Sequence, residues 1–194
     1  MKKLRINAKK LRPLEPSKDY FLSLASSIVS QQISTKAAES IYARFLALFD
    51  SPKGRVNKRT ITPKKLLSLS EQELRNAGLS NQKVIYMQDL AKKFIDGTID
   101  PKQFPKMSDD EIIEHLTRVK GIGVWTAHMF LIFALNRQDI LPIGDLAIKK
   151  GFQKAYGLRK LPTDKKMFAL AEAHKGKWTE LSLHLWSIVD PKSE

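Results

Sequence analysis

Apolar residues return at every third or fourth position along most of this chain, which is the spacing of helices that pack one face against a core. The spacing is clear across residues 20–50 and returns at Trp125–Leu135, Leu146–Tyr156, Lys165–His174 and Trp178–Val189. No stretch shows the sustained alternation of apolar and polar residues, bounded by hairpin turns, that marks paired strands. The sequence therefore predicts an all-α fold with short loops.

Capping signals mark where some of these helices begin and end. Ser70 with Glu73, and Ser108 with Glu111, have the spacing of a capping box, in which the two side chains satisfy each other's backbone N–H groups. Gly78 is placed to end the helix that Ser70 begins. These signals predict two helix starts and one helix end.

The chain carries a large excess of positive charge. Its 34 Lys and Arg residues against 20 Asp and Glu residues give a formal net charge of +14 over 194 residues. Such an excess favours a polyanionic partner, because each phosphate that is neutralised releases condensed counterions. Charge alone also fits a ribosomal protein, a membrane-surface protein or a chain kept soluble by repulsion.

The chain has no cysteine, which excludes disulfides, Cys-based zinc sites and a Cys-ligated iron–sulfur cluster. The four histidines show no metal-ligand spacing, so we expect no catalytic metal. No apolar run is long enough to cross a bilayer, and the basic first residues lack the apolar core of a signal peptide. We expect an intracellular, cytoplasmic protein near the nucleoid, monomeric and without a membrane partner.

The most informative segment is Leu116–Ala127, where an amphipathic helix leads into Gly121-Ile122-Gly123 and a second helix begins at once. Two glycines let the backbone turn tightly and approach a ligand closely. The N–H groups that open the second helix can bind a phosphate. An ordinary tight turn between helices is the alternative, whereas dinucleotide binding is disfavoured because no strand precedes the glycines.

Several segments in order resemble one family of enzymes. Val119–Ala127 followed by Leu141–Asp145 resembles the hairpin and catalytic aspartate of the 3-methyladenine DNA glycosylase II family, within the helix-hairpin-helix superfamily of DNA glycosylases. Upstream, Ile28–Ser34 resembles the first core helix of that family and its DNA-facing end. Leu183–Trp186 resembles the last helix, although the Pro-aromatic-Arg run that commonly precedes it is missing.

The resemblance implies a two-lobed all-α fold with the active site in the cleft between the lobes. It implies a basic N-terminal segment over residues 1–18, a glycosylase domain over 19–194 and a hairpin within about 112–135. Gln32 would occupy the wedge position that fills the gap left by a flipped base, where close relatives often carry an apolar residue. The residues expected to contact DNA are Gln31, Gln32, Ser34, Lys120, Gly121, Gly123, Val124 and Thr126.

Asp145 is the expected catalytic residue. Cleavage between a sugar and its base passes through an oxocarbenium-like state, which a fixed carboxylate stabilises while it orients or deprotonates a water. The family's aspartate does this work at the matching position. Asp145 is also placed to cap the helix Leu146–Tyr156, and the two roles are compatible.

Trp125 distinguishes two chemistries. Related bifunctional glycosylases carry a lysine at this position, and an indole cannot form a Schiff base. Direct hydrolysis that leaves an abasic site is therefore expected. Trp125 is also the main candidate to stack on a positively charged alkylated purine. Tyr20, Phe21 and Trp178 are weaker candidates, each of which also fits a place in the core.

The resemblance further implies a structural Na⁺ or K⁺ ion at the hairpin. Its ligands would be the backbone carbonyls of Thr117, Val119 and Ile122. Backbone ligands leave no side-chain pattern, so this expectation rests on the resemblance alone. No other cofactor is implied.

The sequence thus predicts a monofunctional DNA glycosylase that flips alkylated bases, of the 3-methyladenine and 7-methylguanine type, out of double-stranded DNA for base excision repair. A glycosylase for another damaged base and a non-catalytic helix-hairpin-helix DNA-binding module remain alternatives. A bifunctional glycosylase-lyase is disfavoured by Trp125. A generic basic helical protein would explain the composition but not the ordered motifs.

Overall fold

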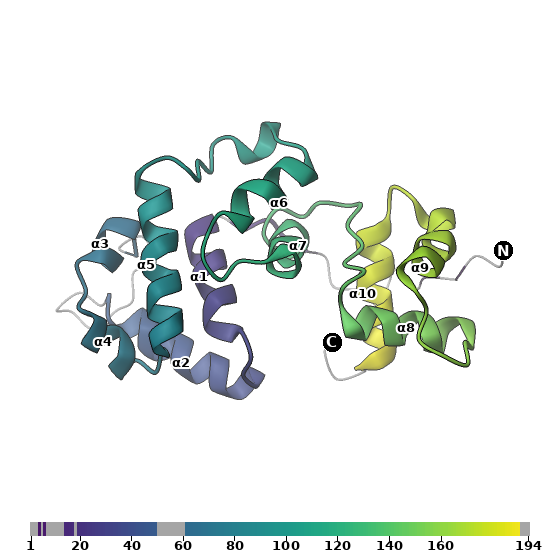
Figure 1. Cartoon of the computed structure of the whole chain (residues 1–194), viewed down its shortest axis with the longest axis horizontal. Helices are drawn as coiled ribbons and strands as arrows, with labels where there is room; N and C mark the ends of the chain where they lie inside the picture. The colour runs from purple at the N-terminus through teal and green to yellow at the C-terminus, as the bar shows by residue number, and fades with distance from the viewer. Residues whose placement is uncertain (1–3, 5, 7–13, 18, 50–60, 191–194) are drawn as a thin grey trace. The chain divides into compact units, whose positions relative to one another are not determined.

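The computed structural model describes residues 4, 6, 14–17, 19–49 and 61–190, and these contain helices and no strand (Figure 1). This confirms the predicted all-α class. None of the helices in these ranges has both the length and the apolar character that crossing a membrane requires. The α-helices are α1 (Tyr20–Ser30), α2 (Thr35–Ala47), α3 (Pro63–Leu67), α4 (Glu71–Asn76), α5 (Asn81–Ile95), α6 (Asp109–Thr117), α7 (Val124–Phe133), α8 (Leu146–Tyr156), α9 (Asp164–Ala171) and α10 (Trp178–Val189), and the 3₁₀ helices are η3 (Phe104–Lys106) and η4 (Glu172–His174).

The chain divides into two compact units. The first unit comprises Met1–Pro16 together with His128–Glu194, and the second comprises Ser17–Ala127, so the division falls within α7. Two units agree with the predicted two lobes. Leu4 and Ile6 pack against the core of the first unit.

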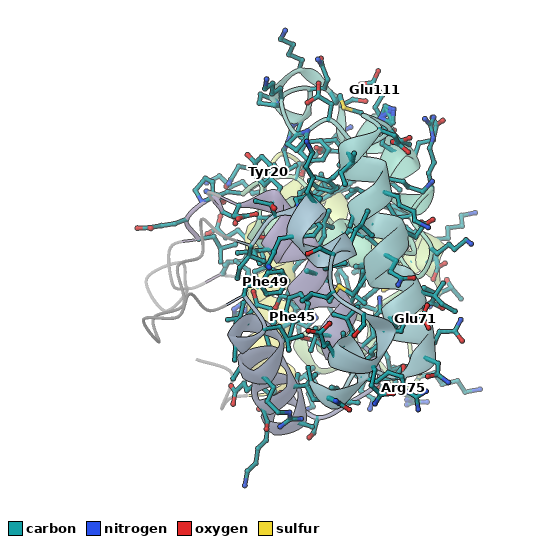
Figure 2. All side chains as sticks on the ribbon, turned by 90° about the vertical axis from the view of Figure 1, so that its left-hand side faces the viewer. Tyr20, Phe45, Phe49, Glu71, Arg75 and Glu111 are labelled. Carbon is teal, nitrogen blue, oxygen red and sulfur yellow. The ribbon has the colours of Figure 1, made fainter. Side chains whose placement is uncertain are left out.

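The core of the second unit forms where α1, α3 and α4 pack against α5, and α2 packs against α1. The buried face of α1 has the predicted spacing, with Leu24 and Ile28 fully enclosed. Phe45 and Phe49 of the α2 end are also buried, and their rings meet edge to face at 5.2 Å (Figure 2). The first stretch of helical spacing that the sequence shows, residues 20–50, therefore contains two helices, α1 and α2, with a corner between them at residues 31–34.

Both predicted capping boxes are confirmed. Ser70 donates its backbone N–H to Glu73 Oε2 at 2.7 Å, and Glu73 returns its N–H to Ser70 Oγ at 3.2 Å. The hydrogen bonds from Ser70 lower the pKa of the Glu73 carboxyl. Ser108 and Glu111 pair in the same way at the start of α6. Gly78 has a φ of +103° and ends α4, as expected of a glycine after a last helical turn.

The first unit is built around the crossing of α8 and α10. Gly151 of α8 lies so close to α10 that a Cβ there would stand 2.7 Å from the Leu185 carbonyl O. The absence of a side chain at this position is what allows the two helices to approach. The core around the crossing consists of Leu141, Ile148, Phe152, Met167, Leu170, Ala171, Leu181 and Leu185.

Replacing Gly151 with Ala tests this close approach. The added Cβ must push α8 from a backbone carbonyl, so we expect a loss of about 1–3 kcal/mol in the free energy of unfolding, or roughly 2–8 °C in Tm. The loss should appear even though alanine favours a helix over glycine by about 1 kcal/mol. Lys150→Ala, at an exposed neighbour, is the matched control and should change stability by less than about 0.5 kcal/mol. A Gly151→Ala variant as stable as this control would contradict the packing.

Candidate active site

The glycines of the hairpin make a tight turn between α6 and α7 in the second unit. Gly121 has a φ of +80°, and a Cβ there would overlap the ring of Tyr86 from α5. A Cβ at Gly123 would meet nothing within 4 Å, so the turn is open at this point. The first helical hydrogen bond of α7 runs from Ala127 N–H to Gly123 O, so the N–H groups before it open the helix. Such a helix start attracts a phosphate.

Contacts from two other helices hold this turn in place. Gln31, at the end of α1, donates its Nε2–H to the Gly121 carbonyl at 2.8 Å and lies 3.5 Å from Thr126 Oγ1. Asp89 of α5 accepts the Lys120 backbone N–H through Oδ2 at 2.8 Å. The amide of Gln31 and the buried hydroxyl of Thr126 are thus used within the protein. Whether these two side chains also contact DNA stays a prediction.

The corner between α1 and α2 carries Gln32. Gln32 is exposed and has a φ of +59°, a left-handed conformation that is uncommon for a residue other than glycine. Ser34 caps α2 by accepting the Ala37 N–H at 3.4 Å. Strained backbone of this kind persists only where the surroundings hold it, and it is concentrated at functional sites. The structure therefore places Gln32 at an exposed tip between α1 and α2.

Asp145 lies in the first unit, at the N-cap of α8, as predicted. Its Oδ1 accepts the Ile148 backbone N–H at 2.9 Å. The same oxygen accepts the indole Nε1–H of Trp186, from α10, at 3.3 Å. Its backbone N–H donates to the Pro142 carbonyl at 2.9 Å, which fixes the turn before the helix. These contacts hold the carboxylate in one orientation.

Two aromatic residues beside Asp145 have no place among the predicted site residues. The ring of Phe133, at the end of α7, stacks on the Trp186 indole with centroids 6.0 Å apart and planes at 23°. Phe133 is 45% exposed, and Leu146 beside Asp145 is 55% exposed. The only sequence signal for Trp186 is the resemblance of residues 183–186 to a helix of the family. That resemblance does not show that the indole faces Asp145. An apolar, partly open surface therefore adjoins the carboxylate.

The other aromatic candidates lie in different surroundings. Trp125, on the first turn of α7, is 49% exposed and so has ring surface to offer a ligand. Phe21 is only 5% exposed and packs edge-on against Phe94. Tyr20 packs in the same manner against Phe104. Trp178 packs on the core of the first unit and donates its Nε1–H to the Ala171 carbonyl. Phe21 is thus buried, whereas Tyr20 and Trp178 are partly buried.

The carbonyls expected to hold a monovalent cation belong to the same hairpin. Val119 O already accepts the Ile122 N–H at 3.0 Å, and a carbonyl has a second lone pair for a cation. The Thr117 hydroxyl donates to the Glu114 carbonyl, and this hydrogen bond does not involve the backbone carbonyl of Thr117. The donor set is neutral oxygen, which suits Na⁺ or K⁺. Within the described ranges, no three His, Asp or Glu side chains gather as a metal site.

The two units present different chemical groups. In the second unit, an open helix start, the exposed Lys120 and the exposed Gln32 tip suit a phosphate backbone. In the first unit, a carboxylate fixed by two donors beside an aromatic stack suits a positively charged reacting group.

Curated relatives are similar in sequence to most of the chain. DNA-3-methyladenine glycosylase 1 of Schizosaccharomyces pombe is 36% identical over 154 residues, which are 79% of this chain and 64% of that protein. DNA-3-methyladenine glycosylase of Saccharomyces cerevisiae is 38% identical over 178 residues, 89% of this chain and 58% of that protein. The chain thus spans about three fifths of the length of these relatives.

Solved structures agree with the sequence comparison. A 3-methyladenine DNA glycosylase from S. pombe in complex with abasic DNA is 31% identical with a TM-score of 0.76, covering 93% of this chain and 87% of that one. A DNA-3-methyladenine glycosidase from Bacillus halodurans is 33% identical with a TM-score of 0.81, covering 94% and 81%. Residues 25–175 match the HhH-GPD superfamily profile, described as base excision DNA repair proteins. The chain therefore belongs to the HhH-GPD superfamily of base excision DNA repair proteins.

Proposed function

We propose that this protein is a monofunctional DNA glycosylase that hydrolyses the N-glycosidic bond of alkylated bases in double-stranded DNA. The observation that carries the proposal is Asp145, a carboxylate fixed by the Ile148 N–H and the Trp186 indole beside an aromatic stack. The names of the relatives, DNA-3-methyladenine glycosylases, support alkylated bases as the substrate class. Bases of the 3-methyladenine and 7-methylguanine type are the proposed substrates.

Asp145 acts on the sugar as the bond to the base breaks. The sugar gains positive charge in an oxocarbenium-like state, and a carboxylate already in position stabilises it without reorganising at the moment of reaction. The same carboxylate orients or deprotonates the attacking water, which adds to the sugar carbon that the base leaves. The base departs with the bonding electron pair, which neutralises the charge that alkylation gave it.

Aromatic rings bind the flipped base. An alkylated purine is positively charged, and such a cation is attracted to the electron-rich face of an indole. Trp125 has half of its surface exposed for this purpose. The Phe133–Trp186 stack offers a second aromatic surface next to the reacting carboxylate. Discrimination comes from charge, since a neutral base gains less from the same rings.

The second unit grips the DNA backbone. The N–H groups that open α7 bind a phosphate, and the net charge of +14 adds attraction that does not depend on sequence. Gln32 enters the stack where the base has left, and its amide can hydrogen-bond the orphaned partner base. A Na⁺ or K⁺ ion held by the Thr117, Val119 and Ile122 carbonyls would add positive charge between hairpin and phosphate.

The indole of Trp125 supports hydrolysis without strand cleavage. A lyase needs an amine that attacks the sugar, and an indole nitrogen is not nucleophilic in this way. Lys120 precedes the hairpin glycines, and its backbone N–H is bonded to Asp89. We assign its ammonium group to phosphate. Two alternatives stay testable in the same assays: a glycosylase for another damaged base, and a module that binds DNA without catalysis.

Replacing Asp145 with Asn tests the catalytic assignment. Asparagine caps a helix as well as aspartate, so the fold is expected to persist while the charge is lost. With methylated duplex DNA, single-turnover base release should fall at least about 100-fold, which corresponds to about 2.7 kcal/mol of transition-state stabilisation. DNA affinity and Tm should stay close to those of the wild type. A fully active variant would show that Asp145 only caps α8.

The product of the wild-type reaction tests the monofunctional assignment. Released base and abasic sites should form in equal amounts, with the DNA strand intact until alkali is added. Borohydride should trap no covalent complex, because no Schiff base forms. Strand cleavage together with borohydride trapping would instead identify a lyase. DNA binding without release of any alkylated base would favour another lesion or a binding module.

Replacing Trp186 with Phe separates the hydrogen bond that orients Asp145 from the packing of the ring against Phe133. Phenylalanine keeps a ring for stacking on Phe133 but cannot donate to Asp145 Oδ1. We expect single-turnover base release to fall about tenfold with unchanged DNA affinity, because a freed carboxylate spends less time in the productive geometry. Trp178→Phe is the matched control, since it removes an indole hydrogen bond to the Ala171 carbonyl. Equal rates for the two variants would exclude a role for Trp186 in orienting Asp145.

A further inference from the structure

Side chains from two helices meet at the end of α1, in the second unit. Gln31 is the C-cap residue of α1, and its Nε2–H reaches 90 positions along the sequence to the Gly121 carbonyl at 2.8 Å. From α5, Lys83 Nζ donates to the Val29 carbonyl at 2.6 Å and to the Gln31 carbonyl at 2.9 Å. One residue, Gln31, is therefore held by Lys83 through its backbone and holds the hairpin through its side chain.

The contact with Lys83 meets a need of the backbone. The last turn of a helix leaves its carbonyls without helical partners, and a cation there is favoured by the helix dipole. Lys83 supplies the charge from a partly buried position, where desolvation lowers the pKa of its ammonium group. The next residue, Gln32, has the strained φ of +59°. Lys83 thus fixes the backbone on which that strained tip depends.

Helix α5 also reaches the hairpin directly. Tyr86 packs its ring against Gly121, and Asp89 accepts the Lys120 N–H. Lys83, Tyr86 and Asp89 follow one another at three-residue steps, so they lie along one side of α5. The corner and the hairpin are therefore braced on the same helix and joined to each other by Gln31.

We propose that Gln31 and Lys83 are positioning residues that fix the Gln32 tip relative to the phosphate-binding turn, so that gripping the backbone and filling the stack occur as one rigid step. This inference rests on the proposed function. Gln31 acts through Gly121 and Lys83 acts through the end of α1, without contacting the DNA. Loss of either side chain leaves the phosphate grip in place but lets the tip and the turn move independently.

The kinetic test uses Gln31→Met and Lys83→Met, which keep side-chain length and remove the donors. Lys92→Met is the matched control, because it removes the same charge from an exposed position on α5. We expect Gln31→Met and Lys83→Met to lower base release at saturating enzyme about tenfold, and Lys92→Met to leave it unchanged. Affinity for undamaged duplex should be the same for Lys83→Met and Lys92→Met. Rates equal to the control would overturn the proposal.

A double-mutant cycle with Gln32→Ala excludes a general loss of stability. If Gln31 acts by placing Gln32, adding Gln31→Met to Gln32→Ala should slow base release by less than about threefold. A full tenfold further loss in the double variant would mean that Gln31 acts independently of the tip and would overturn the proposal. Lys83→Arg keeps a donor at this position and should recover most of the rate.

Amide hydrogen exchange on the free protein tests the positioning role of Gln31 and Lys83 without a catalytic assay. In Gln31→Met and Lys83→Met, amides of residues 118–124 should exchange about tenfold faster, while those of α4 keep the wild-type rate. Unchanged exchange at 118–124 would overturn the proposal even if the wild type is active. If the wild type releases no alkylated base, the proposed function fails, but faster exchange confined to the hairpin would still support the coupling.

Discussion

Every helix leaves backbone N–H groups unpaired in its first turn and carbonyl groups unpaired in its last, and each needs a partner or open solvent. In this protein two of these partners are also residues to which we assign function. The carboxylate of Asp145 satisfies the start of α8, and Lys83 satisfies the end of α1. The start of α7, by contrast, follows an open turn at Gly123. Helix ends therefore organise the fold and the site together.

The helices themselves could be read from the sequence because they depend on local rules. The predicted bounds of α8 and α10 match the structure, since apolar periodicity and cap residues are encoded within a few positions of each other. The capping role of Asp145 could be predicted for the same reason, because a cap residue directly precedes its helix in the sequence. The break at residues 31–34 was indicated only by the resemblance of Ile28–Ser34 to a helix and its DNA-facing end, because no glycine or proline marks this corner and Lys83, which holds it, is distant in sequence.

The contents of the site could be predicted only in part. Helical spacing shows that Phe21 has a buried face, but whether an aromatic ring packs in the core or lines a pocket depends on its neighbours in space. Trp186 and Phe133 meet across 53 residues, and their stack has no local signature. Gln31 illustrates the same limit, because no local pattern shows that its amide donates to a carbonyl 90 residues away.

The missing side chain at Gly151 has a consequence for which residues position 151 can accept. Its closeness to the Leu185 backbone sets how near α10 comes to α8, and the residue after Leu185 carries the indole that reaches Asp145. A position that touches no substrate thereby sets the distance between a carboxylate and its donor. Because the nearest atom is a backbone carbonyl, no exchange of the Leu185 side chain makes room at position 151, so this position is constrained by the hydrogen bond at Asp145 as well as by packing.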